Sequence, residues 1–173
     1  MTPPLFTRGM TLIELMIAIA IVLITSQISM SFLPDLLARN RIDNKINLLY
    51  RYINSARLYA IEKQTYVSIC ALKNNQCVEG EWHNQLSLFI DPNKSASMDS
   101  DDVLLSTFNS IPITDTLQYP RIAITFQPDG SLNGLQNGTF TYCSNRSNIE
   151  GRALSVSQVG RIRIKSTTQC QTP

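Results

Sequence analysis

The most regular feature of the chain is an apolar run close to its beginning. Residues 10–33 form 24 consecutive positions with one charged side chain, Glu14. A helix rises about 1.5 Å per residue, so this run is long enough to cross a bilayer core of about 30 Å. It is too long for the apolar part of a secretory signal, and no small-residue cleavage site follows it. The pattern predicts a transmembrane helix over 10–33, with Arg8 on its cytoplasmic side and the rest of the chain exported.

A second, amphipathic helix is predicted over 34–63, because proline at Pro34 interrupts the first one. Its apolar residues recur at spacings of three and four, which is typical of one buried helix face. These residues are Ile42, Ile46, Leu49, Ile53, Ala56 and Ala60. The basic residues mostly lie off this stripe and are expected to face solvent, with membrane headgroups or a neighbouring subunit as the alternative partner. They are Arg39, Arg41, Lys45, Arg51 and Arg57.

After Lys63 the periodicity changes to that of short strands separated by turns. The predicted strands are 66–72, 86–90, 103–105, 122–126, 138–143, 153–157 and 160–165. The polar segment 93–102 is expected to be an exposed loop, and Pro128-Asp129-Gly130-Ser131 is a turn signal. One long helix followed by many short strands predicts an α+β fold, with 64–173 as a β-rich globular domain.

Composition adds an uneven charge distribution to this picture. Apolar residues make up 43% of the chain and charged residues 16%, which argues against a disordered protein. The net charge of +2 is divided unequally. Residues 143–173 carry five basic side chains and one acidic side chain, whereas the rest of the chain is net negative. Such an asymmetry indicates a surface for a polyanion.

The four cysteines favour disulfides over a metal site. They show no CxxC spacing, and His83 is the only histidine. Exported domains form disulfides, and four cysteines allow three connectivities. Cys70–Cys77 is favoured because Asn74-Asn75 suits a turn within the short gap, and it leaves Cys143–Cys170 as the second pair.

The basic residues of the last predicted strand are candidates for binding. Side chains alternate between the two faces of a strand, so Arg161, Arg163 and Lys165 would share one face while Ile162 and Ile164 face the core. Neighbouring cations repel one another, and a docked polyanion offsets that repulsion. Arginine suits phosphate because its planar group donates two hydrogen bonds at once. The alternative is a solvated edge strand whose charges prevent aggregation.

Catalytic, metal and cofactor sites are not predicted. His83 has no obvious nucleophile near it in the sequence. Asp99, Asp101 and Asp102 lack the glycine and the ligand spacing of an EF-hand, so a solvated loop is preferred to a calcium site. No glycine-rich phosphate-binding loop is present. An exported enzyme is therefore the least supported functional class.

The segment Arg8-Gly9-Met10-Thr11-Leu12-Ile13-Glu14-Leu15 resembles the class III signal of type IV pilins and type II secretion pseudopilins. The resemblance implies that a prepilin peptidase removes the leader 1–9 by cutting after Gly9 and methylates the new N-terminus at Met10. That position is usually phenylalanine in the family. Glu14 would then pair with the N-terminal amine of a neighbouring subunit during assembly. Two opposite buried charges compensate each other, whereas either alone is costly.

Fragments along the rest of the chain resemble the GspH/FimT family of minor pilins. They are Ser55-Ala56-Arg57, Ala60, Val67-Ser68-Ile69-Cys70, Cys77, Trp82, Phe89-Ile90-Asp91, Ile124-Thr125-Phe126, Pro128-Asp129-Gly130 and Val156-Ser157-Gln158-Val159-Gly160-Arg161. The resemblance implies a type IV pilin-like fold, in which a long N-terminal helix packs on an antiparallel sheet domain. It also implies an inner-membrane protein with a periplasmic domain, which joins other pilins in a filament at the cell surface.

Gly160-Arg161-Ile162-Arg163 matches the GRxR pattern of the FimT branch, which is implicated in DNA uptake during natural transformation. The resemblance implies DNA contacts by Arg161 and Arg163. Lys165, Arg152 and Arg146 are supporting candidates by position and charge. Since no aromatic residue lies between these cations, we expect backbone contacts to double-stranded DNA without sequence preference. The competing hypothesis is a structural minor pilin, or a type II secretion pseudopilin, that binds no DNA.

Overall fold

The computed structural model describes residues 10–146, 149–167 and 170, without the side chains of 27–32. The chain divides into two compact units, Met1–Leu37 and Ala38–Pro173, and each is described by itself. Within the described residues, one helix (α1) precedes nine strands (β1 to β9). The predicted leader 1–9, with the cleavage residue Gly9, lies outside the described residues.

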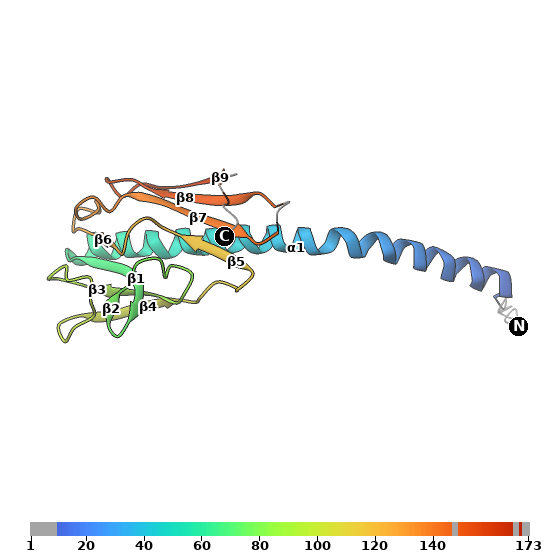
Figure 1. Ribbon diagram of the computed structural model, residues 1–173, viewed down its shortest axis with the longest axis horizontal. Helices are drawn as coiled ribbons and strands as arrows, with labels where there is room; N and C mark the ends of the chain where they lie inside the picture. Colours follow the sequence, from blue (N-terminus) through green and yellow to red (C-terminus); the bar gives the residue numbers. More distant parts are fainter. Residues whose placement is uncertain (1–9, 147–148, 168–169, 171–173) are drawn as a thin grey trace, which may run out of the picture. The chain divides into compact units, whose positions relative to one another are not determined.

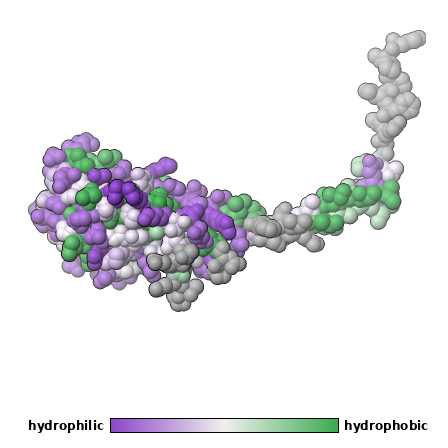
Figure 2. Space-filling view, turned by 90° about the horizontal axis from the view of Figure 1, so that it is seen from above, coloured by the Kyte–Doolittle hydropathy of each residue, from purple (hydrophilic) through white to green (hydrophobic). Residues whose placement is uncertain are grey.

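The first unit contains the beginning of α1. The hydroxyl of Thr11 accepts a hydrogen bond of 3.3 Å from the Glu14 N–H and so caps the helix. Every residue from Met10 to Ser26 is exposed, and Figure 2 shows the hydrophobic colour prevailing there. Among the described residues, no helix has both the length and the hydropathy needed to span a bilayer. The predicted transmembrane helix over 10–33 is therefore not confirmed.

Helix α1 is continuous over Leu12–Lys63 and contains Pro34 in its interior. The prediction that Pro34 interrupts the helix was wrong. Proline removes one backbone N–H donor and crowds the preceding turn, which is a local cost. The hydrogen bonds of the turns before and after it are unaffected, so a long helix tolerates one such position.

In the second unit, α1 packs through the predicted apolar stripe. Its buried residues are Ala38, Ile42, Ile46, Leu49, Ile53, Ala56 and Ala60, each at most 2% exposed. They share one core with strand residues such as Phe126, Phe140 and Leu154. The three-and-four spacing therefore identified the packed face correctly.

Two antiparallel sheets pack against this part of α1, and Figure 1 shows β7, β8 and β9 above the helix and β1 to β4 below it. The first sheet has the order β2-β1-β3-β4, with β6 paired to β1. Its strands are β1 (Val67–Lys73), β2 (Gln76–Cys77), β3 (Leu86–Ile90), β4 (Val103–Phe108) and β6 (Ile124–Phe126). The second sheet has the order β5-β7-β8-β9. Its strands are β5 (Asp115–Gln118), β7 (Gly138–Ser144), β8 (Gly151–Val156) and β9 (Ile162–Thr167).

The α+β prediction is confirmed, although two strands were missed. Strand β2 has two residues, too few for a periodic pattern. Strand β5 has the sequence Asp-Thr-Leu-Gln, in which the buried inward position Asp115 carries a charge. The segment 93–102 contains no strand, as expected, although Ser97 forms an isolated bridge with Gln76.

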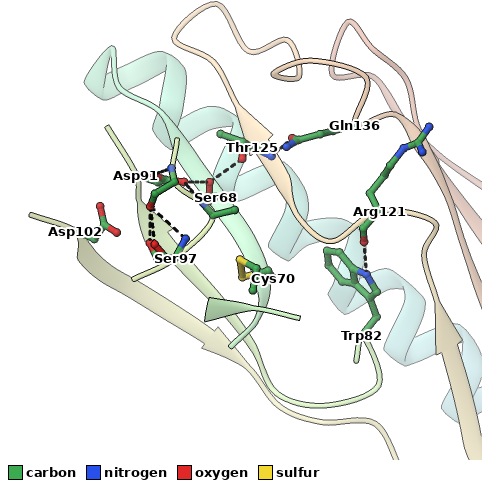
Figure 3. Close-up of a disulfide and its surroundings, with 12 residues drawn as sticks. Ser68, Cys70, Trp82, Asp91, Ser97, Asp102, Arg121, Thr125 and Gln136 are labelled. Atoms are coloured by element: carbon green, nitrogen blue, oxygen red, sulfur yellow. Dashed lines mark hydrogen bonds between the residues drawn. A yellow bond between two sulfur atoms is a disulfide. The ribbon is translucent and has the colours of Figure 1, made fainter. Parts of the chain in front are cut away.

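A buried polar network joins β1, β6 and the end of β3. The carboxylate of Asp91, which is fully buried, accepts a hydrogen bond of 2.7 Å from the Ser68 hydroxyl. The hydroxyls of Ser68 and Thr125 lie 2.8 Å apart, and the Thr125 N–H donates to the side-chain oxygen of Gln136. Figure 3 shows this chain of contacts beside Cys70, whose disulfide partner is Cys77. These polar groups satisfy one another inside the core, as buried polar groups must.

Candidate nucleic-acid interface

The basic residues of β9 lie on the outer face of the second sheet, at its edge. The antiparallel register places Arg163 opposite Ser155 and Lys165 opposite Ala153. All three cations, Arg161, Arg163 and Lys165, are exposed. The predicted alternation is therefore observed for Arg163 and Lys165, which lie roughly 6–7 Å apart along β9, and Arg161 precedes the strand.

The two isoleucines of this segment take the opposite face. Ile162 is partly buried and packs against the core, as expected. Ile164 lies on the same side but is 36% exposed, because β9 is the edge strand and has no neighbour beyond it among the described residues. The strand begins at Ile162 rather than at the predicted Gly160.

The turn between β8 and β9 holds Arg161 at the start of the basic row. The Ser157 N–H donates to the Arg161 carbonyl at 3.0 Å, and the Arg161 N–H donates to the Ser157 hydroxyl at 3.1 Å. Gly160 has φ of +72° and packs against the carbonyl of Gly130. The Arg57 side chain donates to the same Gly130 carbonyl at 2.9 Å. The Pro128–Gly130 turn, the helix and the β8–β9 turn thus meet at one point.

Within the described part of the chain, the guanidinium groups of Arg161 and Arg163 and the amine of Lys165 make no ion pair. Three unneutralised cations on one edge are electrostatically unfavourable for the free protein. Each is available to a phosphate without first breaking a salt bridge.

Arg152 is not brought together with these three residues. It lies opposite Ser166 and therefore on the inner face of the sheet. Its Nε atom donates to the Asp43 carboxylate of α1 at 2.7 Å, and Glu150 approaches its other nitrogen at 3.7 Å. This side chain ties β8 to the helix, a pairing between residues 109 positions apart that the sequence does not reveal.

Arg146 lies in the connection from β7 to β8, at the opposite end of β8 from the turn that carries Arg161. It is exposed, and its backbone N–H donates to the Ser144 hydroxyl at 3.3 Å. The next two residues, 147 and 148, are outside the described part. The register therefore places Arg146 at the end of the sheet opposite Arg161, on the side where β9 ends after Lys165.

Two residues of α1 that were expected to face solvent instead have partners in the second unit. Arg41 forms a two-point ion pair with the buried Asp115, and Arg57 binds the Gly130 carbonyl. The solvated-face interpretation was therefore wrong for both. The basic character of α1 is therefore partly structural, although Arg39 and Arg51 remain exposed.

Both disulfides favoured from the sequence are present, Cys70–Cys77 and Cys143–Cys170. The second joins β7 to the segment after β9 and encloses the whole basic hairpin in a loop with a sequence separation of 27. It therefore fixes the chain before and after the β8–β9 hairpin that carries the candidate interface.

Removing this disulfide with Cys143→Ser/Cys170→Ser should lower the free energy of unfolding by about 3.5 kcal/mol, because the unfolded chain loses a long-loop constraint. Cys70→Ser/Cys77→Ser, whose cysteines are 7 positions apart, is the matched control and should cost about 2.5 kcal/mol. Denaturant unfolding of the full-length protein in detergent measures both values. A larger cost for the short loop would contradict the loop-length argument.

The other candidate residues were His83 and the aspartates of the 93–102 loop. His83 contacts Glu81 at 3.5 Å, and both side chains are largely exposed. Among the described residues, no group of three or more His, Cys, Asp or Glu side chains is arranged to hold a metal ion. The pKa of Asp102 is raised by burial and by the nearby carboxylates of Asp99, Asp91 and Asp101.

Comparisons with known proteins bear on the family and the fold of the chain. Residues 45–160 match the family model of the type II transport protein GspH, and residues 7–26 match the prokaryotic N-terminal methylation motif. The fold is similar to the type IV minor pilin FimU of Pseudomonas aeruginosa, in two crystal forms. The first has 25% identity and a TM-score of 0.60, covering 79% of this chain and 99% of FimU. The second has 25% identity and a TM-score of 0.57, covering 75% and 99%. No curated protein sequence matches significantly.

Proposed function

The chain belongs to the family of the type II transport protein GspH, and from this membership we propose that it is a minor pilin whose β9 edge binds double-stranded DNA during natural transformation. The observation that carries the proposal is the row of Arg161, Arg163 and Lys165, which is exposed and free of ion pairs within the described residues. Such a row neutralises phosphates and releases counterions, and it reads no base sequence.

The structure narrows the set of residues to which we assign this role. Arg152 is engaged by Asp43 on the inner face, so we assign it to fixing β8 on the helix. Arg146 lies at the other end of β8 and stays a secondary candidate. Since three cations give a weak interaction, several subunits along one filament would supply avidity.

Assembly is proposed to depend on the N-terminal segment. The match to the N-terminal methylation motif supports cleavage after Gly9, methylation of Met10 and anchoring in the inner membrane before assembly. Glu14 is proposed to pair with the N-terminal amine of a neighbouring pilin. It lies in the first turn of α1, where a carboxylate is also stabilised by the helix dipole, so it has a role within its own subunit too.

The alternative is a structural minor pilin or a type II secretion pseudopilin without DNA binding, which the same family membership supports. The two hypotheses differ in what they require of β9. In a purely structural subunit, the cations would serve only to prevent aggregation of an edge strand. Such a subunit would not bind DNA, with or without these side chains.

Titration of the full-length protein, in a non-ionic detergent, with fluorescent duplex DNA at several salt concentrations separates them. Arg161→Ala/Arg163→Ala should weaken binding by about tenfold or more and reduce the slope of log affinity against log salt by about 2. Arg39→Ala/Arg51→Ala is the control, because it removes the same charge from exposed positions on α1. An equal loss in the control, unchanged affinity in the first variant, or no binding by the unmodified protein would overturn the proposal.

A further inference from the structure

On the outer face of the second sheet, small and mostly polar side chains of β8 and β7 lie beside the basic residues of β9. The pairing of β9 with β8 and of β8 with β7 aligns residues across three strands. One row contains Arg163, Ser155 and Thr139. The next contains Lys165, Ala153 and Thr141. Adjacent strands are about 4.8 Å apart, so each row extends about 10 Å from the edge.

This outer face carries no acidic side chain at the outward positions of β5, β7, β8 and β9. These positions are Thr116, Gln118, Thr139, Thr141, Cys143, Gly151, Ala153, Ser155, Arg163, Lys165 and Thr167. The acidic residue of these strands, Asp115, points inward and is buried. Figure 2, which views the molecule from the side of β8 and β9, shows that hydrophilic side chains predominate on the globular unit.

Resting on the proposed function, we propose that the duplex lies across β9, β8 and β7 rather than alongside β9 alone, with the hydroxyls of Ser155 and Thr139 contacting its phosphates. Serine and threonine hydroxyls are regular phosphate ligands in protein–DNA complexes. Thr139 is exposed and Ser155 is half-buried, so both are reachable from outside. The Ser155 hydroxyl donates to the Arg163 carbonyl at 3.4 Å, a long hydrogen bond that it would exchange for one to a phosphate. The small side chain of Ala153, in the middle of the second row, allows a DNA backbone to approach the face closely.

Two acidic residues, Glu79 and Glu150, lie near the borders of this proposed DNA-binding surface. Beyond β7, the exposed Glu79 lines a hollow together with Thr139, Thr141 and Gln118. A carboxylate there repels phosphate, which limits the footprint to the side of Thr139 nearer β9. Glu150, before β8, is directed to Arg152 and the inner face.

Thr139→Asp tests this footprint, because it places a carboxylate two strands away from the basic row without replacing any cation. We expect duplex affinity of the full-length protein at low salt to fall by about five- to tenfold. Asn109→Asp is the matched control: it changes the net charge equally at an exposed position just after β4 in the other sheet, and it should change affinity less than about twofold. Thr139→Val, which removes the hydroxyl without adding charge, should weaken binding by about twofold.

The outcomes distinguish this inference from the proposed function. Thermal melting of all three variants establishes whether they are folded. If Thr139→Asp does not fold, the affinity of Thr139→Val still tests the proposal. Suppose that Thr139→Asp and Thr139→Val both bind DNA as tightly as Asn109→Asp does, while Arg161→Ala/Arg163→Ala has lost binding. This result would overturn the proposal that the duplex crosses β8 and β7, and it would leave the proposed function standing. No binding by the unmodified protein would overturn both.

Discussion

Replacing Asp115 with alanine is expected to lower the free energy of unfolding by about 3 kcal/mol. The Asp115 side chain is fully buried, and its carboxylate accepts hydrogen bonds of 2.9 and 2.7 Å from Arg41. It also accepts one of 2.8 Å from the Tyr142 hydroxyl. Alanine would leave a buried hydroxyl without an acceptor and a partly buried guanidinium without a counter-charge, and each loss is unfavourable.

Asp115 stabilises the protonated form of both donors. The hydrogen bond to Asp115 is the main cause of the raised pKa of Arg41. Burial, followed by the hydrogen bond to Asp115, raises the pKa of Tyr142 far above that of a free phenol. Arginine and tyrosine are protonated at neutral pH in any case, and the raised pKa values keep both groups donating to Asp115 further into alkaline pH. The cluster therefore links α1, β5 and β7.

Asp43→Ala provides the matched control, since it also removes an aspartate that pairs with an arginine between α1 and the second sheet. The Asp43 and Arg152 side chains are 43% and 28% exposed, so water replaces the lost contact. We expect a cost of about 0.5 kcal/mol there. Denaturant unfolding of the full-length protein in detergent compares the two variants, and costs within 1 kcal/mol of each other would refute the claim that burial makes the Asp115 cluster structural.

The helix and most strands could be predicted from the sequence because their signals are local. The spacing from Ile42 to Ala60 defines one packed face whatever the rest of the chain does. Strand β5 could not be predicted in this way, since Asp115 is tolerated in the core only because Arg41 lies opposite it, 74 positions earlier. The continuity of α1 through Pro34 was missed for a related reason: a local breaker signal was outweighed by a long helix on both sides.

The candidate interface also combines features that follow from local sequence patterns with features that depend on distant residues. Alternation within one strand was enough to place Arg163 and Lys165 on one face, whereas Arg161 lies in the turn just before that strand. The separation of Arg152 from them depends on its partner Asp43, which lies on a distant element. The row formed with Ser155 and Thr139 depends on the register of three strands. No sequence pattern contains that register, although alternating threonines in β7 were a signal that its outer face is polar.

The glycine of the Gly160-Arg161-Ile162-Arg163 segment has a structural reason to be there, and its replacement is the second prediction with a large effect. A Cβ atom at Gly160 would lie 1.9 Å from the Gly130 carbonyl oxygen and 2.8 Å from the Arg57 Nε atom. The first contact is with backbone, which cannot rotate away. Gly160→Ala is therefore expected to cost about 3–4 kcal/mol, combining the strain of a positive φ with separation of the two turns.

Gly80→Ala isolates the contribution of this close approach. Gly80 has φ of +78°, nearly that of Gly160 at +72°, but a Cβ atom there meets nothing within 4 Å. It should cost only about 1 kcal/mol, measured by denaturant unfolding of the full-length protein in detergent. Equal costs at the two positions would show that the contact with Gly130 is dispensable. Gly160→Ala should also weaken duplex binding, although it retains every cation. Arg161 is the next residue in the sequence, so displacement of the turn would displace Arg161 too.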